Sequence, residues 1–151
     1  MCTISHSDGT LVTFDRLFAN IPQLKFFYMS CAQNSFSMFK RDTFKKLADI
    51  LPLSKEYSCI NLSRLTVGLD DLTEAFDFAT VTDFLLKNES LFIFLGFDKN
   101  IPLSSGYKEI IENFIAKIIE TPPKQIPLIE FPEFENSVYY DDYRKLYDLR
   151  K

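Results

Sequence analysis

The chain has 151 residues, a length typical of one domain. Hydrophobic residues make up 46% and charged residues 25%, which excludes an intrinsically disordered chain. The formal net charge of -4 argues against a protein that binds nucleic acid, because no positive field gathers the phosphates.

Apolar residues recur at spacings of three and four in four segments, and this periodicity predicts amphipathic helices. Pro22 and Pro52 follow the first two segments and end them, since proline cannot extend the helical hydrogen bonds. A short run rich in β-branched, aromatic or aliphatic residues follows each helix and predicts a strand. In chain order the elements are helix 8–21, strand 24–29, helix 42–51, strand 57–62, helix 77–87, strand 91–97, helix 104–120 and strand 126–131.

The centres of the four predicted strands are nearly evenly spaced. Phe27, Ile60, Ile93 and Ile129 are 33, 33 and 36 residues apart. Such spacing predicts an α/β fold of stacked helix–strand repeats with a short parallel sheet, like a leucine-rich-repeat array. Strands joined by helices should lie side by side, parallel and in chain order. The alternative is a compact doubly wound α/β layer, which also alternates helices and strands.

The C-terminal segment 136–151 carries tyrosines four residues apart, at Tyr139, Tyr143 and Tyr147. We interpret it as a helix that packs its tyrosines over the last strand and caps the array, within one domain of residues 1–151. The alternative is a tail that binds a partner.

Residues with the potential for chemistry are few. His6 is the single histidine, and no nucleophile stands in a recognisable setting beside it. The acidic cluster Asp70, Asp71, Glu74 and Asp77 offers oxygen ligands for a hard cation, but a solvated loop before a helix N-terminus fits it better. We therefore predict no catalytic, cofactor-binding or metal-binding residue and no cofactor.

The three cysteines, Cys2, Cys31 and Cys59, are too few and too far apart for a disulfide framework or a structural zinc site. The N-terminus lacks the pattern of a secretory signal, and the longest apolar stretch, 91–95, is too short for a membrane span. These features predict reduced thiols and a cytoplasmic or nuclear location, without membrane binding.

Three segments resemble the C-terminal half of nematode F-box proteins, known as the FTH or F-box-associated domain and regarded as divergent and leucine-rich-repeat-like. The resemblance extends over about residues 8 to 134. The segments are IPQLKFFYMS, the passage from Leu72 through Phe78 to Leu86, and IPLSSGYKEIIENFIAKIIETPPKQIPLIEFP.

The resemblance implies a protein-recognition module, similar to the substrate-recruiting part of a cullin-type ubiquitin ligase. Its protein partner and the residues that bind it are not predictable from the sequence. Met1 to Ser7 are too few and too polar to form an F-box, so we do not expect the ligase adaptor to bind this chain directly. The alternative function is that of a small α/β domain that binds a ligand or acts as a hydrolase. It would require a deep cleft with ionisable residues of shifted pKa.

Overall fold

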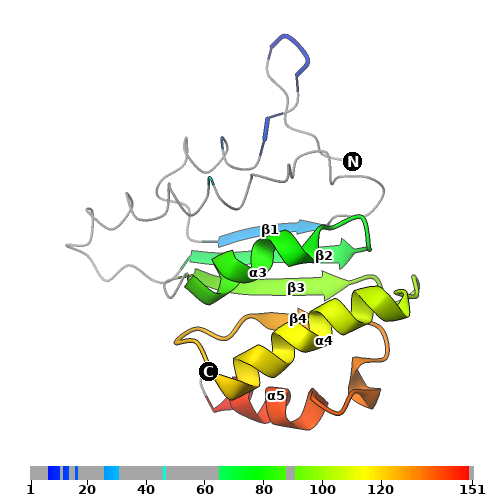
Figure 1. Cartoon of the computed structure of the whole chain (residues 1–151). Coiled ribbons are helices and arrows are strands. Elements are labelled where there is room, and N and C mark those ends of the chain that lie inside the picture. Colours follow the sequence, from blue (N-terminus) through cyan, green and yellow to red (C-terminus); the bar gives the residue numbers. More distant parts are fainter. Residues whose placement is uncertain are drawn as a thin grey trace, which may run out of the picture.

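The structure, a computed structural model, describes residues 7–10, 12–13, 16, 26–30, 46, 65–87 and 91–149 (Figure 1). It is a mixed α/β fold in which helices pack on a four-stranded parallel sheet. The predicted strand 57–62 lies outside the described residues, and of the predicted helix 42–51 only residue 46 is described, in helical conformation. The predicted helix 8–21 does not start where expected. Residues 8–10 form a turn in which the Asp8 side chain accepts from the Thr10 N–H, residues 12–13 are not helical, and only residue 16 of the described ones is in a helix.

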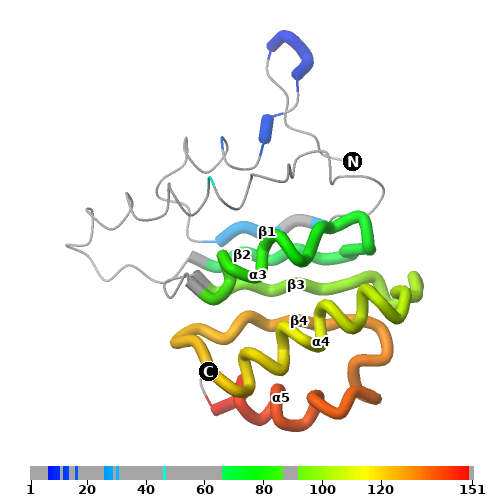
Figure 2. Tube along the Cα trace, in the orientation of Figure 1, coloured from blue at the N-terminus to red at the C-terminus, as the bar shows by residue number. Residues whose placement is uncertain are grey.

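The strands are β1 (Phe26–Ser30), β2 (Leu65–Leu72), β3 (Leu91–Phe97) and β4 (Leu128–Glu130). They lie side by side in chain order, as Figure 2 shows by the succession of colours across the sheet. Each strand is parallel to its neighbours. In the register of the sheet, Phe27 pairs with Val67 and Val67 with Ile93. The predicted strands around Phe27, Ile93 and Ile129, their order and their parallel direction are confirmed.

The second strand of the sheet differs from the prediction. Ile60 lies outside the described residues, and β2 takes the place between β1 and β3. Matched positions are therefore 40 residues apart from Phe27 to Val67, 26 from Val67 to Ile93 and 34 from Leu95 to Ile129. The regular spacing thus does not hold in the sheet. The sequence of β2, LTVGLDDL, explains why this strand was not predicted. Its glycine and two aspartates are unfavourable in strands and are typical of loops.

Helices α3 (Phe78–Lys87) and α4 (Ser105–Glu120) form close to the predicted ranges and lie together on one face of the sheet (Figure 1). Ser104 caps α4, since its side chain accepts from the Tyr107 N–H. Phe114 is 3% exposed and packs edge-on against Phe78, with ring centroids 5.5 Å apart. Ile110 of the same helix is 42% exposed because it lies at the margin of the apolar stripe of α4.

The C-terminal helix α5 (Tyr140–Asp148) forms within the predicted range 136–151, after the short 3-10 helix η3 (Phe134–Asn136). Tyr143 is fully buried, and its hydroxyl donates to the Pro127 carbonyl just before β4. Nη1 of Arg144 lies 3.5 Å from Oε1 of Glu130 in β4, so the two side chains form an ion pair. The Tyr143 side chain therefore packs beside the last strand, whereas the Tyr147 ring contacts Phe92 of β3. Helix α5 lies along the β4 edge (Figure 1).

Candidate functional site

The sheet has a second face, which neither α3 nor α4 covers (Figure 1). We call it the open face. Strand alternation and register assign its residues, since side chains two apart on a strand point the same way. They are Phe26, Tyr28 and Ser30 of β1, Thr66, Gly68 and Asp70 of β2, Phe92, Phe94 and Gly96 of β3, and Leu128 and Glu130 of β4.

The open face exposes aromatic side chains. Phe26 is 62% and Tyr28 50% exposed, and Phe92 and Phe94 are half-buried. Exposed aromatic residues gathered on one surface are typical of a place where another molecule binds. Helix α5 borders this face on the β4 side, where the Tyr147 ring lies 6.3 Å from that of Phe92.

Two glycines let the rings of Tyr28 and Phe94 approach the backbone of the sheet closely. A Cβ atom at Gly68 would stand 2.5 Å from Cδ2 of Tyr28, so the Tyr28 ring rests on the Gly68 backbone. A Cβ atom at Gly96 would stand 2.8 Å from Cζ of Phe94 and 2.4 Å from Oδ1 of Asp70. Any larger residue at either position would lift these side chains off the strands.

A β-bulge in β2 brings two carboxylates to the end of the open face. Leu69 and Leu72 of β2 pair with Leu95 and Phe97 of β3, so β2 has one residue more than β3 between these two pairs. Because of this extra residue, Leu69 and Leu72 both face the core, and both are fully buried. Asp71 takes up the irregularity with φ of 55°, a left-handed conformation that aspartate tolerates better than most residues.

Hydroxyl groups of β1 hold both carboxylates in place. The Tyr28 hydroxyl donates to Oδ2 of Asp70 at 2.5 Å, and the Ser30 hydroxyl donates to Oδ2 of Asp71 at 2.5 Å. Oδ1 of Asp70 also accepts from the Asp71 N–H at 3.0 Å. The open face thus combines aromatic rings at one end with oriented carboxylates at the other.

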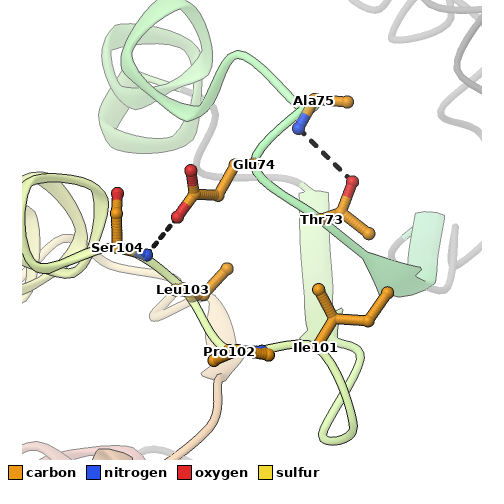
Figure 3. A pocket seen from close by; sticks show the side chains of 7 residues that line it. All are labelled: Thr73, Glu74, Ala75, Ile101, Pro102, Leu103 and Ser104. Carbon is orange, nitrogen blue, oxygen red and sulfur yellow. Dashed lines mark hydrogen bonds between the residues drawn. The ribbon is translucent and has the colours of Figure 1, made fainter.

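A hollow of about 510 Å³ lies at the carboxyl ends of β2 and β3, where α/β sheets often bind ligands. It is lined by Thr73, Glu74, Ala75 and the segment 101–104, which leads into α4 (Figure 3). The Glu74 carboxylate accepts from the Ser104 N–H at the start of α4 (Figure 3). The position at which this helix N-terminus would bind an anion therefore already holds a carboxylate of the chain itself.

The titratable groups with shifted pKa belong to the packing of the fold. Burial raises the pKa of Tyr107, whose hydroxyl donates to the Phe76 carbonyl, and likewise raises that of Tyr143. Partial burial also raises the pKa of Tyr147. The hydrogen bond from Lys108 lowers the pKa of the exposed Glu133. The three tyrosines are therefore neutral at physiological pH.

The structure separates the predicted acidic cluster. Asp70 and Asp71 lie in β2, not in a loop as the sequence predicted, because pairing with β1 and β3 extends the strand through them. Glu74 contacts the start of α4, and Asp77 directly precedes α3. Among the described residues, no three acidic, histidine or cysteine side chains come close enough to hold a metal ion.

His6 and the three cysteines lie outside the described residues. Sequence reasoning missed the aromatic residues of the open face. The only signal for them was the strand segment FFYMS, in which Phe26 and Tyr28 alternate with Phe27.

Comparison with known proteins finds no matching family model, no similar curated protein and no similar solved structure. In the part of the chain that the structure describes, no helix has both the length and the apolar character needed to cross a membrane.

Proposed function

We propose that the chain is a protein-recognition module that binds its partner on the open face of the sheet. The observation that carries this proposal is the pair of exposed aromatic side chains, Phe26 and Tyr28, on a sheet face that neither α3 nor α4 covers. Aromatic residues supply much of the binding energy at protein interfaces, and a rigid sheet holds them in place without further ordering. The role fits the substrate-recruiting part of a ubiquitin ligase, as the resemblance to F-box-associated domains implies.

The finer description of the fold belongs to the same proposal. Parallel strands in chain order, each of the last three followed by a helix, are compatible with a divergent helix–strand array that binds through its sheet. The unequal spacings would then reflect insertions between the units.

The test is affinity capture from an extract of the organism's own cells, with two variants. Phe26→Ala removes an exposed ring of the open face, whereas Ile110→Ala removes an exposed apolar side chain of α4, on the opposite side of the sheet. We expect wild type and Ile110→Ala to capture the same proteins in similar amounts. Phe26→Ala should fail to capture them. Equal retention by all three proteins would contradict binding through the open face.

The alternative function, a hydrolase or ligand-binding domain, receives less support. Its best candidate site is the hollow beside Glu74. The Glu74 carboxylate already accepts a hydrogen bond from the Ser104 N–H at the start of α4, so it is engaged within the fold. A panel of hydrolase and phosphatase substrates tests this alternative. Turnover that Glu74→Gln or Asp70→Asn abolishes, with the fold intact, would replace the recognition proposal by an enzymatic one.

A further inference from the structure

We propose that the partner segment on the open face is extended and carries an arginine, whose guanidinium binds Asp70 beside the rings of Tyr28 and Phe94. This inference rests on the proposed function and names the chemistry of the partner. Three observations support it: the charge of the face, the placement of the rings around Asp70 and the spacing of the rows of side chains.

The first observation is charge. The open face ends in Asp70 and Glu130, with Asp71 beside them. Arg144 lies at Glu130, but in the described contacts the partners of Asp70 and Asp71 are hydroxyl and amide groups rather than cations. The β1–β2 side of the face is therefore negative, and a partner with positive charge complements it.

The second observation is the surroundings of Asp70. Each of its oxygens accepts one hydrogen bond, from the Tyr28 hydroxyl or the Asp71 N–H. Because a carboxylate oxygen has two acceptor positions, each retains one for a partner. The Tyr28 ring lies over Gly68 and the Phe94 ring over Gly96, so the two rings flank the carboxylate.

This arrangement favours arginine over lysine. A guanidinium is planar, stacks on aromatic rings and donates two parallel hydrogen bonds to one carboxylate. An ammonium group is a compact, strongly hydrated charge that gains less from flat rings.

The third observation is spacing. Side chains of the open face form three rows across the strands, through Phe26 and Phe92, through Tyr28 and Phe94, and through Ser30 and Asp70. Rows two residues apart on a strand are about 6.6 Å apart, which is also the distance between alternate side chains of an extended peptide. An extended segment along the strands would therefore place apolar side chains two and four positions from its arginine onto the first two rows.

The experiment measures the binding of labelled peptides to the full chain by fluorescence anisotropy. The probe is the peptide Ser-Leu-Ser-Leu-Ser-Arg-Ser. The same sequence in reversed order is also used, because the segment can run parallel or antiparallel to the strands. Matched peptides carry lysine or glutamate in place of the arginine. We expect the arginine peptide in its better direction to bind at least about tenfold more tightly than the glutamate peptide, and more weakly as salt increases.

Two variants locate the binding site. Asp70→Asn removes the charge but keeps the size of the side chain and its ability to accept from Tyr28. Asp141→Asn removes an equal charge from the exposed surface of α5. Asp70→Asn should weaken binding of the arginine peptide by about tenfold, whereas Asp141→Asn should leave it unchanged.

The outcomes separate this inference from the proposal on which it rests. If the arginine peptide binds no better than the glutamate peptide, or if Asp70→Asn binds it as wild type does, the inference is wrong. Capture of a protein that depends on Phe26 would still support recognition through the open face in that case. If the lysine peptide binds as tightly as the arginine peptide, the preference for a guanidinium is wrong.

Discussion

At the scale of single residues, the open face depends on glycines that are unfavourable for strand formation. Glycine in a strand loses backbone entropy and offers no side chain to pack. Gly68 and Gly96 instead provide the space in which the rings of Tyr28 and Phe94 rest on the backbone. These two positions therefore serve the surface rather than the stability of the sheet.

Gly68→Ala should alter the open face with little loss of stability. The new Cβ would meet the Tyr28 ring at 2.5 Å, and the ring, being half exposed, can turn away from the sheet. We expect a change in the free energy of unfolding below about 1.5 kcal/mol in urea melts. The NMR signals of the Tyr28 ring should shift, and binding of the arginine peptide should weaken. An unchanged Tyr28 environment would show that its ring does not rest on Gly68.

Gly106→Ala is the matched control, with the opposite expectation. Gly106 lies in the first turn of α4, and a Cβ there would contact nothing within 4 Å. Alanine restricts the unfolded chain and favours the helix, so the variant should gain about 0.4–1 kcal/mol in the same urea melts. Its peptide binding should equal that of wild type. A loss of stability would contradict the open surroundings of Gly106.

At the scale of elements, α4 holds the core together. Its buried residues Ile111, Phe114, Ile115 and Ile118 form one stripe, which faces the sheet and α3. The Phe114 ring packs against the Phe78 ring, whose centroid lies 6.4 Å from that of the Phe97 ring in β3. Aromatic contacts therefore connect both helices to the sheet.

Phe114→Ala should destabilise the domain strongly. The change removes a ring that is 3% exposed and leaves a cavity between α3, α4 and the sheet, which costs about 3–5 kcal/mol. Against a total stability of about 5–15 kcal/mol, this loss can unfold the domain. Ile110→Ala on the same helix, 42% exposed, should cost below about 1 kcal/mol. Similar losses of stability in urea melts of both variants would contradict the assignment of Phe114 to the buried face and Ile110 to the exposed face of α4.

The sequence predicted the elements whose periodicity is strong and local. Helices α3 and α4 and strand β3 agree with it because their apolar residues recur at regular spacing and buried surface stabilises the same pattern. Strand β2 could not be found in this way. Its bulge breaks the alternation after Leu69, and Asp71 follows where a regular strand would place a core residue.

At the scale of the whole molecule, the candidate site forms only when the sheet assembles. Tyr28 and Asp70 are 42 residues apart in the chain, and the parallel register of β1 and β2 brings them together. The sequence singled out Asp70 and Asp71 as charged residues, but not their hydroxyl partners or the nearby rings. Pairing between distant strands is not encoded in local periodicity, so the site had to come from the structure.

The stability of the whole molecule should fall at alkaline pH because of its buried tyrosines. Burial raises the pKa of Tyr107 and Tyr143 in the folded state above the ordinary value of about 10 that the unfolded chain retains. Between these values the unfolded state binds fewer protons than the folded state. The stabilisation from each neutral tyrosine is thus complete below about pH 10 and is lost as the pH rises further.

Tyr143→Phe tests this pH dependence. The variant should lose about 1 kcal/mol near pH 8, because the Pro127 carbonyl loses its donor. Since phenylalanine does not ionise, the difference in unfolding free energy from wild type should narrow or reverse in urea melts near pH 11. Phe131→Leu, which changes a buried ring without a hydroxyl, serves as control and should keep a constant difference from wild type. If the Tyr143→Phe difference is also constant, ionisation of Tyr143 does not limit the alkaline stability of the fold.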